Sequence, residues 1–153
     1  MTSSSEKILV VFCDNHPAAP GDPLRAKLLY AFLRRFLRPG FRHCFAVIPD
    51  RDGLTILDPR SDGLRVERLR GHGYLADLQF SADCGLLRLA VVARRAPDGN
   101  PRVGFYTCVG FITRLLGLPR MRPGPISPYQ LYSELQRIEC GEGAKHGRQA
   151  KSA

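Results

Sequence analysis

The sequence has no long apolar run. Nowhere in its 153 residues do apolar side chains approach the roughly 20 consecutive positions that a membrane-spanning helix needs. The residues from Met1 to Glu6 are polar and lack the apolar segment of a secretory signal peptide. We therefore expect a protein without a transmembrane segment that is located in the cytoplasm.

Paired cysteines are also missing. The chain has five cysteines, an odd number, and no two of them form a Cys-x-x-Cys pair. Without a secretion signal, this usage indicates reduced thiols rather than a disulfide framework. The four histidines add no recognisable zinc-ligand spacing, so we expect no metal and no other cofactor.

Acidic residues are scarce relative to basic ones. The chain has 14 acidic and 23 basic residues, a net charge of +9, and lysine supplies only four of the basic residues. An acid-free block between Pro23 and Pro49 carries the candidate surface for an anionic partner, which consists of Arg34, Arg35, Arg38 and Arg42. Such a surface attracts nucleic acid, a lipid surface or a cell-wall glycan. The alternative is a solvated helix face whose arginines reflect a GC-rich genome.

The hydrophobic pattern predicts an α+β domain over residues 1–138 and a disordered basic tail over 139–153. Short apolar runs between turn residues predict strands over 7–13, 41–48, 54–58, 64–69 and 86–93. Consecutive strands with such short connections favour a largely antiparallel sheet, packed against helices. The segment 71–84 fits a loop or a loop with a short helix.

Helices are predicted from apolar spacing and from residues typical of helix ends. The first covers 22–38 and carries most of the basic block, and we expect its apolar stripe to pack in the core. The second begins after Thr107 and ends at Gly117, a residue suited to a left-handed C-terminal cap. The third begins at Ser127, with Gln130 completing a capping box.

Three residues carry candidate catalytic chemistry: Cys108, His43 and Asp58. Cys108 lies in the first turn of a predicted helix, where unpaired backbone N–H groups and the helix dipole stabilise a thiolate, the nucleophilic form. His43 interrupts an apolar strand, and Asp58 closes the next strand, where a carboxylate can orient an imidazole. The alternative is structural: a small buried thiol, a packed histidine and a turn-forming aspartate.

The other cysteines are assigned no role in catalysis. Cys44 follows His43 on the same predicted strand, and neighbouring strand residues point to opposite faces. We therefore exclude Cys44 from the candidate site. Cys13 and Cys84 are expected to be buried structural thiols.

The segment TCVGFITRLLG (107–117) resembles the nucleophile motif of the NlpC-type papain-like cysteine peptidases, an Asp-Cys-Ser-Gly-Phe-Val pattern that opens a helix. Cysteine, glycine and phenylalanine match, whereas Thr107 replaces the aspartate and Val109 the serine. The histidine segment FRHCFAVI (41–48) precedes the cysteine. This order is similar to the circularly permuted branch, which includes the lecithin:retinol acyltransferase-like proteins. Further phrases, FLRPGFRHCF and SPYQLYSEL, look like short alphaproteobacterial and phage proteins.

The resemblance implies a permuted papain-like fold and a cysteine hydrolase of the peptidase or amidase type. His43 would act as base toward Cys108 and Asp58 would orient His43, with a peptide, amide or acyl compound as substrate. A first alternative is a catalytically inactive binding protein, associated with a virion if a phage encodes it, that contacts an anionic partner through its basic helix. A second is an acyltransferase that works at an anionic membrane surface.

Overall fold

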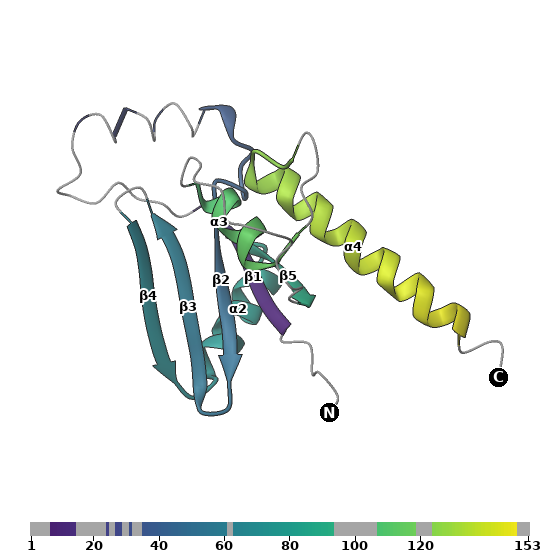
Figure 1. The fold of residues 1–153 in the computed structure, drawn as a ribbon. Helices are drawn as coiled ribbons and strands as arrows, with labels where there is room; N and C mark the ends of the chain where they lie inside the picture. Colours follow the sequence, from purple (N-terminus) through teal and green to yellow (C-terminus); the bar gives the residue numbers. More distant parts are fainter. Residues whose placement is uncertain are drawn as a thin grey trace.

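The computed structural model describes residues 7–14, 24, 27–28, 31, 35–60, 63–93, 107–118 and 124–149, with side chains up to residue 139 in the last range. Its elements follow the order β1-β2-β3-β4-α2-β5-α3-α4 along the chain (Figure 1). Within these ranges no helix is long and apolar enough to cross a membrane.

Five strands form one antiparallel sheet in the spatial order β4-β3-β2-β1-β5. They are β1 (Lys7–Cys13), β2 (His43–Asp50), β3 (Gly53–Arg60), β4 (Gly63–Arg70) and β5 (Leu87–Ala93). The predicted α+β class and antiparallel sheet are confirmed. β1, the first strand in sequence, pairs with both β2 and β5, so it lies inside the sheet rather than at an edge.

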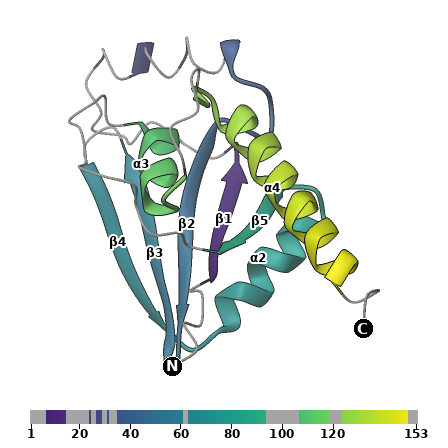
Figure 2. The same ribbon diagram turned by 45° about the vertical axis from the view of Figure 1, so that its right-hand side comes forward.

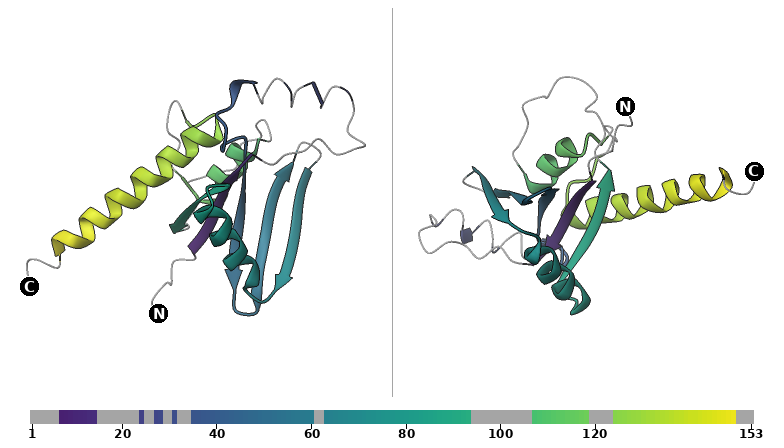
Figure 3. Two further views of the ribbon diagram at one scale, coloured as in Figure 1. Left: turned by 180° about the vertical axis from the view of Figure 1, so that it is seen from behind. Right: turned by 90° about the horizontal axis from the view of Figure 1, so that it is seen from below.

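Helices cover both faces of this sheet. α2 (Gly73–Asp83) packs on one face, whereas α3 (Cys108–Leu115) and α4 (Pro128–Gln149) pack on the other (Figures 2 and 3). The segment 71–84, which the sequence leaves open, thus contains a helix. Leu78 is its one buried residue, and this narrow contact explains why no clear apolar period marks it in the sequence.

The interior of β1 supplies side chains to both faces, since strand residues alternate. Ile8, Val10 and Phe12 pack against α3 and α4, and Val11 packs against α2. All four are fully buried. This two-sided burial explains why β1 reads as a continuous apolar run rather than as an alternation.

Aromatic rings fix the chain where it enters β2. Phe41 is 8% exposed, and its ring centroid lies 6.0 Å from that of Phe12 and 5.0 Å from that of Tyr132 on α4. These contacts join the start of β2 to β1 and α4. The position of the chain two residues before His43 is therefore fixed by packing against β1 and α4.

The predicted helix ends are confirmed for α3 and α4. The Thr107 hydroxyl accepts a hydrogen bond of 3.0 Å from Gly110 N, and Gly117 has the positive φ of 61° that a left-handed cap requires. Ser127 Oγ accepts from Gln130 N at 3.3 Å, while Gln130 Oε1 accepts from Ser127 N at 3.2 Å. This reciprocal pair is the capping box.

Two helical expectations differ from the structure. The predicted helix over 22–38 is helical at residues 24, 27, 28, 31, 35 and 36, and much of it lies outside the described residues. Its apolar residues Leu24, Leu28 and Phe36 are 71%, 63% and 69% exposed, so the expected core packing is wrong for these three.

α4 continues to Gln149, through most of the segment for which composition predicts a disordered tail. Several glycines lower the helix propensity of this segment, yet no proline interrupts it. The helix also gains a tertiary anchor where the predicted domain ends, because Glu139 Oε1 accepts a hydrogen bond of 3.0 Å from Val91 N on the edge strand β5.

Candidate active site

Cys108 is the first residue of α3, as the sequence predicts. The extended conformation of Thr107 (φ −110°, ψ 156°) turns the chain into the helix at this point. The Cys108 side chain is partly exposed. The residue therefore combines partial exposure with a position at the positive end of the helix dipole, which favours a thiolate.

His43 is the first residue of β2 and is only 6% exposed. Its Nε2 lies 2.6 Å from Asp58 Oδ1 on β3. A carboxylate only accepts, so Nε2 carries the hydrogen of this bond. The imidazole also lies close enough to the Cys108 side chain for the two groups to shift each other's pKa.

The three side chains meet where two strands separate. The β2–β3 pairing runs from Asp50↔Gly53 to Ala46↔Leu57, so His43 and Asp58 both lie past its end. α3 packs over β2 and β3, and Figure 2 shows the two strands diverging from their hairpin toward this helix. Because β2 and β3 are no longer paired at this end, side chains from both strands can approach the N-terminus of α3.

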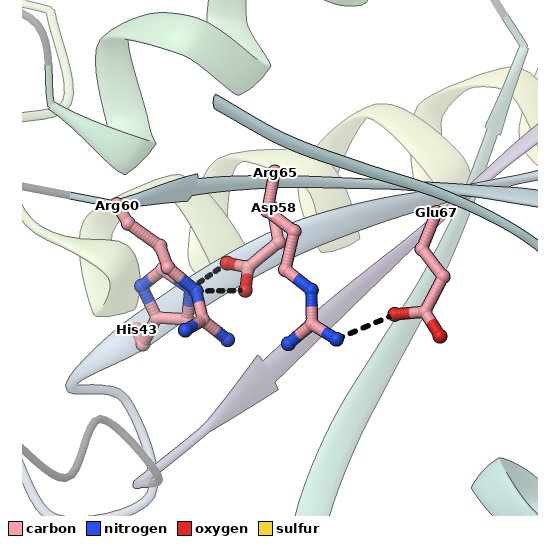
Figure 4. Close-up of polar contacts among 5 residues, drawn as sticks. All are labelled: His43, Asp58, Arg60, Arg65 and Glu67. Atoms are coloured by element: carbon pink, nitrogen blue, oxygen red, sulfur yellow. Dashed lines mark hydrogen bonds and ion pairs between the residues drawn. The ribbon is translucent and has the colours of Figure 1, made fainter. Parts of the chain in front are cut away.

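Arg60 completes the chain of polar contacts and was not singled out in the sequence. Its Nε donates a hydrogen bond of 2.8 Å to Asp58 Oδ2, the carboxylate oxygen that His43 leaves open (Figure 4). The Arg65–Glu67 ion pair lies beside it on β4, at 3.0 Å. Arg60 stands two residues after Asp58 on one strand, so alternation places both on one face; this spacing was the available signal.

The protonation of the site follows from these contacts. The hydrogen bond from Cys44 lowers the pKa of Cys108 most; burial opposes it, and His43 lowers the value further, to about 4. Burial lowers the pKa of His43, but Asp58 and Cys108 outweigh burial and raise it from 6.5 to about 9. Burial likewise opposes ionisation of Asp58, yet His43 and Arg60 bring its pKa to about 2. Near neutral pH the site therefore holds a thiolate and an imidazolium.

The exclusion of Cys44 is wrong. Alternation does hold, because Cys44 packs with the cluster under α3 while His43 stacks on Phe45, with ring centroids 6.4 Å apart on the other face. Cys108, however, contacts both neighbours past the end of the β2–β3 pairing. Both the side chain and the backbone of Cys44 lower the pKa of Cys108, so the two residues lie close together. The interaction with Cys108 and, after it, burial hold the pKa of the Cys44 thiol well above its usual range, so Cys44 remains protonated.

The remaining cysteine expectations need one correction. Cys84, expected to be buried, is exposed beyond the end of α2, and Cys13 is partly buried at the end of β1. The described residues contain no group of three or more His, Cys, Asp or Glu side chains arranged for a metal ion.

The residues of the candidate anionic surface are not equivalent. Arg34 lies outside the described residues, and Arg35 is exposed. Arg38 is also exposed, and its guanidinium lies 4.2 Å from the centroid of the Tyr129 ring. Arg42 is half-buried, with Nε 3.8 Å from Asp14 Oδ1, which reduces its field toward solvent.

The Asp58 contact gives a first testable prediction. Asp58→Asn keeps the size of the side chain but removes the charge that raises the pKa of His43, so that pKa should fall from about 9 by about 1–3 units. NMR titration of the His43 imidazole measures this shift. Asp50→Asn is the matched control. Asp50 also contacts a histidine, but it does so only through its backbone oxygen, 3.0 Å from His72 Nε2, so this substitution removes no carboxylate from an imidazole. An unchanged His43 titration in Asp58→Asn contradicts the assigned role.

Comparisons of the chain with protein-family models, with curated proteins and with solved structures find no match.

Proposed function

We propose that this chain is a cysteine hydrolase of the peptidase or amidase type. Cys108 is its nucleophile, His43 its general base and acid, and Asp58 the residue that orients His43. The observation that carries the proposal is the His43–Asp58 hydrogen bond of 2.6 Å beside Cys108, whose thiol and the His43 imidazole lie close enough to shift each other's pKa. A packed thiol and a packed histidine would not need an ion-paired aspartate behind the imidazole.

The reaction follows from the protonation of the site. The Cys108 thiolate attacks the carbonyl carbon of the substrate, and the oxygen that becomes negative lies toward the backbone N–H groups at the N-terminus of α3. The His43 imidazolium gives its proton to the leaving amine or alcohol. A water molecule, deprotonated by His43, then attacks the thioester and releases the acid, which restores the thiolate.

The two departures from the peptidase motif are compatible with this proposal. Thr107, in place of the motif's aspartate, still caps the helix through its hydroxyl. Val109, in place of the serine, is 2% exposed and packs in the core below the helix. Thr107 and Val109 therefore cap and pack α3, and Cys108 remains the first residue of the helix. We propose the permuted papain-like arrangement on the same grounds: a histidine strand that precedes the cysteine helix.

An activated ester tests the proposal without knowledge of the natural substrate. With p-nitrophenyl acetate, wild-type protein should form an acetyl thioester at Cys108, detected by peptide mass spectrometry, and release p-nitrophenol beyond one equivalent as the thioester turns over. Cys108→Ser should lose both signals. Cys84→Ser is the matched control, because Cys84 is an exposed thiol on a different element, at the C-terminal end of α2. Equal acetylation of Cys84 and Cys108 would contradict a selected nucleophile.

The pH dependence of this reaction provides a second prediction. Below about pH 4 the Cys108 sulfur is protonated and inactive, and above about pH 9 His43 has lost the proton that the leaving group needs. Acyl transfer should thus rise through the first value and fall through the second, and both limbs belong to the coupled pair. A steady-state pH–rate profile measures them. A single limb near the pKa of a free thiol, about 8.5, would show that the pair does not form.

A further inference from the structure

The Cys44 thiol forms no bond with the substrate in the hydrolysis proposed above, but it lies against the proposed nucleophile and lowers its pKa. Cys44 is fully buried in the core cluster under α3, and the partly exposed Cys108 packs against this cluster. The two thiols are close enough for each to shift the pKa of the other, so a small movement of α3 against β2 would bring the sulfurs to the length of a disulfide bond, about 2.05 Å. The pair joins a solvent-accessible thiolate to a protected thiol from a different element of the fold.

We propose that Cys44 and Cys108 form a reversible disulfide when the protein meets a peroxide, with Cys108 oxidised first and Cys44 acting as the resolving thiol. The inference requires only the thiol pair and does not depend on hydrolase activity. Its oxidant is hydrogen peroxide, and its reductant is a small dithiol or monothiol from solution.

The first step converts Cys108 to a sulfenic acid. The thiolate attacks one peroxide oxygen, an S–O bond forms, and the O–O bond breaks. The departing hydroxide takes the proton of the His43 imidazolium and leaves as water. Cys108 is oxidised before Cys44 for two reasons. The thiolate is the reactive form of cysteine, and of these two residues only Cys108 is partly exposed to solvent.

The second step joins the two cysteines. The Cys44 sulfur attacks the Cys108 sulfur, an S–S bond forms, and the S–OH bond breaks. The thiol proton of Cys44 leaves with the hydroxyl as a second water. Two thiols are thus oxidised by two electrons, and one peroxide is reduced to two waters. The disulfide removes the nucleophile, and an external thiol restores it by exchange.

The test is a stoichiometric oxidation of native wild-type protein with hydrogen peroxide, followed by alkylation and peptide mapping. The number of free thiols should fall from five to three. The peptides that contain Cys44 and Cys108 should be linked, with a mass lower by two hydrogen atoms, and dithiothreitol should separate them. Cys108 should react at least about tenfold faster than Cys84, the internal reference for an exposed thiol.

Variants separate the roles of the two sulfurs. In Cys44→Ser, which keeps the size of the buried side chain, Cys108 should stop at the sulfenic acid, trapped by dimedone, and then proceed to the sulfinic acid. Cys84→Ser should form the disulfide as wild type does. If the serine hydroxyl perturbs folding, Cys44→Ala replaces Cys44→Ser. Far-UV circular dichroism verifies that each variant is folded.

Two outcomes would overturn the proposal. One is a sulfinic acid at Cys108 in wild-type protein while Cys44 remains alkylatable after unfolding. The other is a link from Cys108 to Cys13, whose Cα pairs with that of His43 in the β1–β2 register and which therefore lies near the same strand end. Neither outcome bears on ester hydrolysis, so the test is independent of the proposed function.

Discussion

Replacing His43 with alanine is expected to raise the pH at which Cys108 becomes reactive and to lower acyl transfer at about pH 7 by about 10²–10⁴-fold. The imidazolium stabilises the thiolate by a hydrogen bond and by its charge, so its loss leaves burial to favour the neutral thiol. The hydrogen bonds from Cys44 and the helix N-terminus remain. The pKa of Cys108 should therefore move from about 4 upward by about 2 units or more, short of a free thiol.

The measurement is the iodoacetamide labelling rate of each cysteine across pH, determined by peptide mass spectrometry. Cys84 provides the reference for an exposed thiol in the same sample. His72→Ala is the matched control, because His72 is exposed and its ring contacts a backbone oxygen at the other end of β2. If Cys108 keeps its pH profile in His43→Ala, or labels only when the protein unfolds, the proposed catalytic pair does not exist.

Gly53→Ala is expected to destabilise the fold by about 3 kcal/mol. Gly53 opens β3 opposite Arg70 on β4, and a Cβ at this position would lie 2.1 Å from the backbone oxygen of Leu69. Backbone atoms cannot rotate away as a side chain would, so the β3–β4 pairing must shift. For a domain of this size the midpoint of thermal unfolding should fall by about 6–12 °C.

Gly73→Ala is the control for this substitution. Gly73 is the first residue of α2, and a Cβ there meets no atom within 4 Å. Alanine should leave its midpoint unchanged or raise it slightly, because it lowers the entropy of the unfolded chain. Differential scanning calorimetry compares the two variants. Equal midpoints for both would mean that β3 and β4 adjust freely around Gly53.

The local features of the fold were readable because they depend on neighbouring residues. The alternation or run of apolar side chains placed each of the five strands to within two residues at each end. Thr107 and Gly117 delimited α3 because a hydroxyl and a glycine satisfy backbone groups a few positions away. The sequence did not clearly predict α2, because a helix with a single buried residue shows no apolar period.

The contacts among distant residues were not readable in the same way. Alternation correctly separates His43 from Cys44 by face, yet both contact Cys108 because the β2–β3 pairing ends before them. Nothing within a few positions of Cys44 encodes where that pairing ends. The same holds for β1, whose place between β2 and β5 depends on partners more than 25 residues away.

The sequence by itself determined the five strands and the position of Cys108 at a helix N-terminus, since both follow from interactions within a few residues. Only the tertiary structure decided that Arg60 ion-pairs the carboxylate behind His43 and that Cys44 lies against Cys108. The physical reason is that strand separation and helix docking set the distances between these groups. Those distances in turn set the protonation of the site, because hydrogen bonding, burial and charge act only at close range.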